Sequence, residues 1–131
     1  MFLIAAVRRS IPLAVGFVLL AWSAGAAAAV DALHGKWSSN LPRCEQVNGE
    51  VDVLTITSSS LGFYEIGCKL SKPERSRDEF RFAARCHKGG SPETSGTVVI
   101  RRLSPGTIAL ALHGFSWTTT EPATFHRCAA R

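Results

Sequence analysis

The chain contains four histidines, the side chains best suited to act as general acids, general bases or metal ligands near neutral pH. They are His34, His87, His113 and His126. A hydrolytic site would pair one of them with a serine or cysteine nucleophile and an acidic residue. The chain has no G-x-S-x-G or H-E-x-x-H motif and no G-x-x-x-x-G-K-[ST] phosphate loop. We therefore predict no catalytic residue and no enzyme activity, and a hydrolase with a Ser/His pair is the weakest alternative.

Four cysteines are spread over the last two thirds of the chain. They are Cys44, Cys68, Cys86 and Cys128. An even number in an exported protein indicates two disulfides. The alternative is a metal site made from Cys86, His87, His126 and Cys128, but this spacing differs from that of structural zinc sites. No C-x-x-C-H motif for haem attachment occurs either. We predict no metal site and no cofactor.

Basic residues are concentrated in the middle of the chain. Seven lie between Lys69 and Lys88, where only three acidic residues, Glu74, Asp78 and Glu79, accompany them. These three alternate with basic residues, which indicates a self-paired, solvated loop rather than a catalytic or calcium site. The basic side chains could face an anionic surface, or they could be an ordinary solvated strand face. The predicted basic patch consists of Lys69, Arg81, Arg85 and Arg101, with Arg102 as the alternative to Arg101.

The first 29 residues have the pattern of a secretory signal peptide. Arg8 and Arg9 precede an almost wholly apolar run over residues 11–22, and small residues fill positions 24–29. The run is too short for the roughly 20 residues that a membrane-spanning helix needs. We expect cleavage after Ala28 or Ala29, a periplasmic or secreted location, and no membrane span.

Removal of this segment takes away two of the 15 basic residues and none of the 10 acidic ones. The formal charge then falls from +5 to +3, with 13 basic residues against 10 acidic ones. Such a small excess does not indicate a nucleic-acid-binding protein.

The length of 131 residues allows one domain, which we expect over residues 30–131. An apolar content of 46% with 19% charged residues is typical of a globular chain. Residues 79–87 alternate between apolar and polar side chains, as a half-buried strand does. Turn residues separate other short β-rich segments, which predicts an all-β antiparallel meander, either a small barrel or a sandwich. We predict the barrel, because an even number of strands lets the first and last strands pair and leaves no free edge. The eight predicted strands are 35–39, 51–57, 61–70, 79–87, 97–103, 107–112, 115–120 and 124–128.

The positions of the cysteines along these strands suggest how they pair. Cys44 and Cys68 fall at one end of the predicted barrel, and Cys86 and Cys128 fall at the other end. We therefore predict the disulfides Cys44–Cys68 and Cys86–Cys128, one of three possible connectivities.

The Gly35-Lys36-Trp37 sequence opens the first predicted strand and resembles the start of the lipocalin-like (calycin) barrels. This resemblance implies that Trp37 packs across one end of the barrel. In size and cysteine layout the chain is also similar to small periplasmic β-barrels that inhibit lysozymes or proteases. No inhibitory motif is present, so this second resemblance implies no site residue.

Taken together, these features predict an exported, non-catalytic binding protein. In one hypothesis the barrel interior or mouth binds a small apolar ligand near Trp37 or Trp117, although in a small barrel such aromatics more often fill the core. In the other hypothesis a loop, over residues 71–78 or 88–96, projects into an exported partner protein such as a hydrolase.

Overall fold

The computed structural model describes residues 12–14, 16, 30–45 and 52–129. The predicted signal peptide, residues 1–29, lies outside the described residues except for 12–14 and 16. Residues 46–51, which include the start of the predicted second strand, also lie outside them. In the described part of the chain, no helix is long and apolar enough to cross a bilayer.

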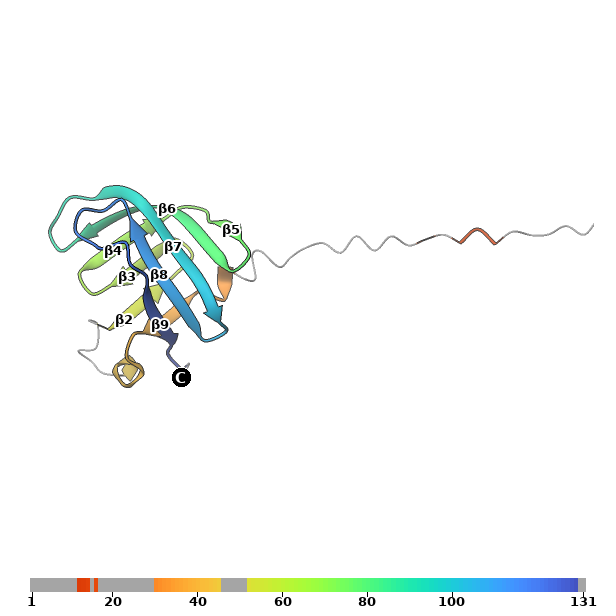
Figure 1. Cartoon of the computed structure of the whole chain (residues 1–131), viewed down its shortest axis with the longest axis horizontal. Coiled ribbons are helices and arrows are strands. Elements are labelled where there is room, and N and C mark those ends of the chain that lie inside the picture. Colours follow the sequence, from red (N-terminus) through yellow and green to blue (C-terminus); the bar gives the residue numbers. More distant parts are fainter. Residues whose placement is uncertain (1–11, 15, 17–29, 46–51, 130–131) are drawn as a thin grey trace, which may run out of the picture.

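Short strands joined by tight turns make up nearly all of the described fold, as Figure 1 shows. The strands are β1 (Gly35–Ser38), β2 (Val53–Ile56), β3 (Ser60–Phe63), β4 (Ile66–Leu70), β5 (Glu74–Ser76), β6 (Glu79–Lys88), β7 (Thr94–Ser104), β8 (Thr107–His113) and β9 (Ala123–Arg127). A 3-10 turn, η1 (Leu41–Glu45), follows β1.

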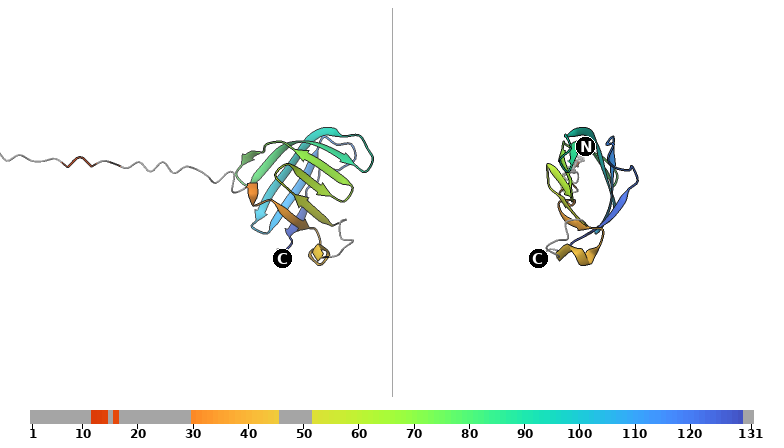
Figure 2. Two further views of the ribbon diagram at one scale, coloured as in Figure 1. Left: turned by 180° about the vertical axis from the view of Figure 1, so that it is seen from behind. Right: turned by 90° about the vertical axis from the view of Figure 1, so that its left-hand side faces the viewer.

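Eight of these strands form a closed antiparallel barrel. Each pairs with its neighbour along the chain, and β4 pairs directly with β6 because β5 lies outside the ring. The first and last strands pair through Trp37 opposite Arg127 and Ser38 opposite His126, which closes the barrel. The views in Figure 2 show the strands surrounding one core. The predicted all-β meander barrel is confirmed, including the pairing of its first and last strands.

The barrel interior is filled by apolar side chains. The alternation predicted for residues 79–87 is confirmed, since Phe80, Phe82, Ala84 and Cys86 on β6 are buried and Arg81 and Arg85 are exposed. Burying such side chains is the main favourable term in the folding of a barrel of this size. The largest fully buried residues come from all around the ring: Trp37, Phe80, Phe125, Leu33, Leu54, Leu61, Ile100, Ile108 and Val98.

Two of the eight predicted strands are wrong. The barrel still has eight strands, because one error missed a strand and the other added one. The segment 61–70 is two strands, β3 and β4, because the chain reverses at Tyr64 and Glu65, and Tyr64 adopts a positive φ of 46°. The segment 115–120 is a loop between β8 and β9, and Gly114 leaves β8 with a φ of 89°. The predicted loop over residues 71–78 contains the extra strand β5.

The predicted disulfide pairing is also wrong. The disulfides are Cys44–Cys128 and Cys68–Cys86. Cys68 lies on β4, directly opposite Cys86 on β6, so the two sulfur atoms meet across one strand pair. The prediction treated β3 and β4 as one strand, so it gave β6 the wrong direction and placed Cys86 at the opposite end of the barrel from Cys68.

Candidate functional site

Trp37, the first predicted ligand-binding residue, is part of a closed end of the barrel. Its side chain is 1% exposed, and its Nε1 donates a hydrogen bond of 2.9 Å to the Leu33 carbonyl oxygen. The Arg127 guanidinium lies 4.1 Å from the Trp37 ring centroid and donates hydrogen bonds to the carbonyl oxygens of Ala32 and His34. Trp37 therefore packs at a closed end of the barrel and offers no free surface there.

Arg127 is the residue that holds this end together, and it is partly buried. Burial lowers the pKa of its guanidinium, and the nearby positive charge of Arg102 lowers it further. Such a group still stays protonated in a protein. Its cation–π contact and hydrogen bonds are therefore present throughout the physiological pH range.

Trp117, the second predicted ligand-binding residue, lies at the opposite end of the barrel. Trp117 follows the end of β8. Trp37 lies near the other end of β8, because it is opposite Arg127 on β9 and the neighbouring His126 pairs with Thr107, the first residue of β8. The Trp117 ring stacks on Phe115, with centroids 5.0 Å apart, and Phe115 packs over Gly96. The Trp117 Nε1 is buried and has no hydrogen-bond partner among the described residues. The two tryptophans therefore do not form one site.

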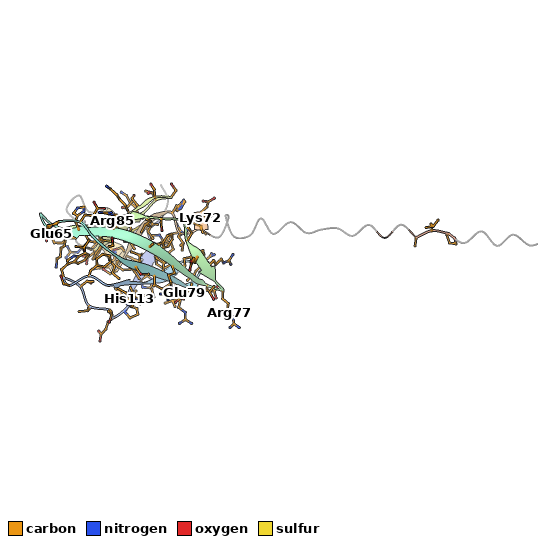
Figure 3. All side chains as sticks on the ribbon, turned by 90° about the horizontal axis from the view of Figure 1, so that it is seen from above. Glu65, Lys72, Arg77, Glu79, Arg85 and His113 are labelled. Carbon is orange, nitrogen blue, oxygen red and sulfur yellow. A yellow bond between two sulfur atoms is a disulfide. The ribbon has the colours of Figure 1, made fainter. Side chains whose placement is uncertain are left out.

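The predicted basic patch is divided between two places on the outer face of the barrel. Lys69 and Arg85 are directly opposite each other on β4 and β6. Arg81 lies further along β6 and forms an ion pair of 3.9 Å with Glu79, which is itself opposite Arg101. Figure 3 shows this separation, with Arg85 far along the sheet from Glu79.

A hollow of about 300 Å³ lies on the outer face beside the Lys69–Arg85 pair. We call it the outer hollow. Its wall and floor come from β2, β3, β4, β6 and the turn after β6, and none of its polar side chains points into the barrel. The residues that line it are Thr55, Ser60, Leu61, Gly62, Gly67, Cys68, Lys69, Arg85, His87 and Glu93.

The strand register aligns these residues in two rows. Thr55, Gly62, Gly67 and His87 follow one another across four strands. The second row lies two residues away from the first row on each strand, a separation of about 7 Å. It contains Ser60, Lys69 and Arg85. Because side chains alternate between the two faces, residues in both rows point outward.

Two glycines make the floor of the outer hollow. Gly62 and Gly67 are paired across β3 and β4, where other outward positions carry side chains. A Cβ added at Gly62 would meet nothing within 4 Å, whereas one at Gly67 would lie 2.6 Å from the His87 ring. The space over Gly62 is therefore open, and the His87 imidazole covers Gly67.

Glu93 lies between the two cations at the rim. Its Oε1 is 3.2 Å from Arg85 Nε, and its Oε2 is 3.7 Å from Lys69 Nζ. Lys69 and Arg85 remain 80% and 65% exposed, and Glu93 is 29% exposed. Two positive charges face one carboxylate, so these three side chains give the rim a net positive charge.

Two of the histidines contact polar side chains in the described part of the chain. His126 Nδ1 lies 3.3 Å from the Thr107 hydroxyl oxygen, and His34 Nδ1 lies 3.7 Å from Asp31. Over residues 30–45 and 52–129, no serine hydroxyl is hydrogen-bonded to a histidine ring. Cys86 and Cys128 belong to different disulfides, so the metal site considered from the sequence is not formed.

Several residues of the outer hollow were not singled out by the sequence. Gly62 and Gly67 fall inside the segment 61–70, which was predicted as one strand, and only the reversal between them makes them partners. Glu93 follows Gly89-Gly90, a turn signal that predicts a hairpin and so a return of the chain towards Arg85. That signal was present, but the predicted fold left residues 88–96 as a loop without placing Glu93.

Comparison with known proteins identifies no relative of this chain. Family models, curated proteins and solved structures were all searched, and none of them matches this chain.

Proposed function

We propose that this protein is an exported, non-catalytic binding protein that holds a small ligand in the outer hollow. The observation that carries this proposal is the open space over Gly62 on a face where neighbouring strand positions carry side chains. About 300 Å³ is the lower end of the range for small-molecule sites. The lining combines a carbon-rich floor with a few polar groups at the rim, which is the usual character of such sites.

A ligand inside the barrel, as first expected, has less support. Trp37, Phe80, Phe82 and Phe125 are buried in the interior with many aliphatic side chains. One end is closed by Trp37 and Arg127, and Phe115 packs over Gly96 near the other. In a barrel of this size such side chains act as core.

The proposed location is the periplasm or the extracellular space. The two disulfides are consistent with an oxidising compartment. The predicted signal peptide supports the same location.

The test is the native mass of protein taken from the compartment to which it is exported. We expect extra mass that is present under native conditions and lost on denaturation. Gly62→Val should remove it by filling the open space, because valine suits a strand and meets no neighbour at its Cβ. Thr124→Val, at an exposed position on β9, should keep it. A bare native mass, or extra mass that Gly62→Val retains, would contradict binding in the outer hollow.

A second candidate function is contact with a partner protein through the β5–β6 hairpin. Residues 74–78 are all exposed and lie outside the closed ring. Arg77 adopts a φ of 55° at the turn, and Figure 3 shows its side chain at the end of the hairpin, pointing away from the barrel. A projecting tip of this kind would suit an inhibitor of a lysozyme or protease, as the second resemblance implies.

This candidate is tested by assaying a lysozyme and a protease with the purified protein. Inhibition should be lost with Arg77→Glu and kept with Arg101→Glu, which reverses an exposed charge outside the hairpin. Equal effects of the two variants would show that net charge, rather than the hairpin, is responsible.

A further inference from the structure

We propose that the ligand of the outer hollow is a small organic carboxylate with a flat body. Its carboxylate would bind at Lys69 and Arg85, and its body would lie on the backbone floor over Gly62. This inference rests on the proposed function and specifies the ligand class that the site would take.

The shape of the floor supports a flat body. Gly62 and Gly67 are paired across two strands, so the floor beneath the open space is backbone without side chains. The His87 ring covers the Gly67 side, since a Cβ at Gly67 would lie 2.6 Å from its Cε1 and 3.1 Å from its Nε2. The open space is thus bounded by an aromatic ring on one side and by the strand surface below. A planar group can contact both at once, in the offset or edge geometry that rings prefer.

The rim supports an anionic group. Lys69 and Arg85 are like charges directly opposite each other on neighbouring strands, an arrangement that is unfavourable without a compensating anion. Only the Nε of Arg85 is paired with Glu93 among the described residues. The other guanidinium donors and the largely exposed Lys69 ammonium can therefore receive a second anion.

Glu93 indicates which anion fits the rim. Its carboxylate already contacts both cations, with one oxygen towards each, at 3.2 Å and 3.7 Å. A ligand carboxylate that binds the same pair would compete with Glu93 for these donors. Glu93 then acts as an internal competitor that weakens binding, while Lys69 and Arg85 strengthen it.

This competition predicts substitutions with opposite effects on one measured affinity. The probe is benzoate, with neutral benzamide as its matched control, titrated into the oxidised protein while the amide resonances of Gly62 and Gly67 are followed by NMR. Benzoate is a probe that fills only part of a hollow of about 300 Å³, so we expect it to bind more weakly than a retained ligand and to shift these resonances with a Kd of about 1 mM. Benzamide should bind at least about tenfold more weakly, because it lacks the charge-assisted hydrogen bonds.

The variants distinguish the parts of the site. Arg85→Gln should weaken benzoate binding about tenfold, and Glu93→Gln should tighten it several-fold by removing the competitor. Gly62→Val should abolish binding of both probes. Arg81→Gln, which changes an outward arginine on the same strand outside the hollow, should leave the affinity unchanged.

Three results would overturn this inference. Equal binding of benzamide and benzoate would remove the requirement for a carboxylate while leaving the hollow as a binding site. Weaker benzoate binding by Glu93→Gln would show that Glu93 is not a competitor. Absence of any shift at Gly62 and Gly67 up to about 10 mM benzoate would exclude this ligand class, and the native-mass experiment would still decide the proposed function independently.

Discussion

Glycines of similar appearance in the sequence have different roles in this barrel. Gly96 on β7 faces the interior, opposite Ala84, and the Phe115 ring packs against it. Gly62 on β3 faces outward and has open space above it. The first glycine is required for packing, and the second leaves room for a ligand.

This difference predicts opposite effects of the same substitution. A Cβ at Gly96 would lie 2.4 Å from Phe115 Cζ and 2.5 Å from the His113 carbonyl oxygen, which is backbone and cannot rotate away. Gly96→Ala should therefore lower the free energy of unfolding by about 1–3 kcal/mol. Gly62→Ala should raise it by about 0.5 kcal/mol, because alanine loses less backbone entropy than glycine. Urea unfolding of the two variants measures both effects, and similar losses in both would contradict this assignment of the two glycines.

At the scale of elements, the reversal between β3 and β4 decides most of the site. It pairs Gly62 with Gly67, and it places Lys69 opposite Arg85 and Cys68 opposite Cys86. The sequence shows a continuous β-rich segment there, because Phe63 and Ile66 are apolar residues on either side of a two-residue turn. Tyr64 takes a positive φ without a glycine or asparagine, so the usual hairpin signal is missing.

The disulfide pattern provides a direct check of this reversal. Digestion of the unreduced protein after glutamate and after basic residues separates Cys44 from Cys68, for example at Glu45 and Glu65. The fragment with Cys68 should be linked to the one with Cys86, and the fragment with Cys44 to the one with Cys128. Mass spectrometry before and after reduction identifies the linked fragments. A link between Cys44 and Cys68 would contradict the register that places Cys68 on β4 opposite Cys86 on β6.

For the whole molecule, the Cys44–Cys128 disulfide connects the turn after β1 to the end of β9. The two residues are 84 positions apart, whereas Cys68 and Cys86 are only 18 apart. The longer loop constrains nearly the whole described fold in the unfolded state. In the chain-entropy model its contribution to stability is the larger of the two.

Cys44→Ala combined with Cys128→Ala should therefore lower the free energy of unfolding by about 4 kcal/mol. The closed barrel and the second disulfide should be retained, because neither residue lies in the pairing between β4 and β6. Urea unfolding gives the free energy, and circular dichroism checks that the strand content is unchanged. A loss below about 1 kcal/mol would show that the unfolded chain is not constrained by this bridge.

The sequence by itself determined the all-β meander, the alternation on β6, the pairing of the first and last strands and the presence of disulfides. These features depend on local patterns, namely side-chain period, turn residues and cysteine parity. Only the tertiary structure decided which cysteines pair, that Lys69 and Arg85 form a pair away from Arg81 and Arg101, and that two glycines form an open floor. Those features depend on strand register, and a single unpredicted reversal at Tyr64 changes which residues lie opposite each other across four strands.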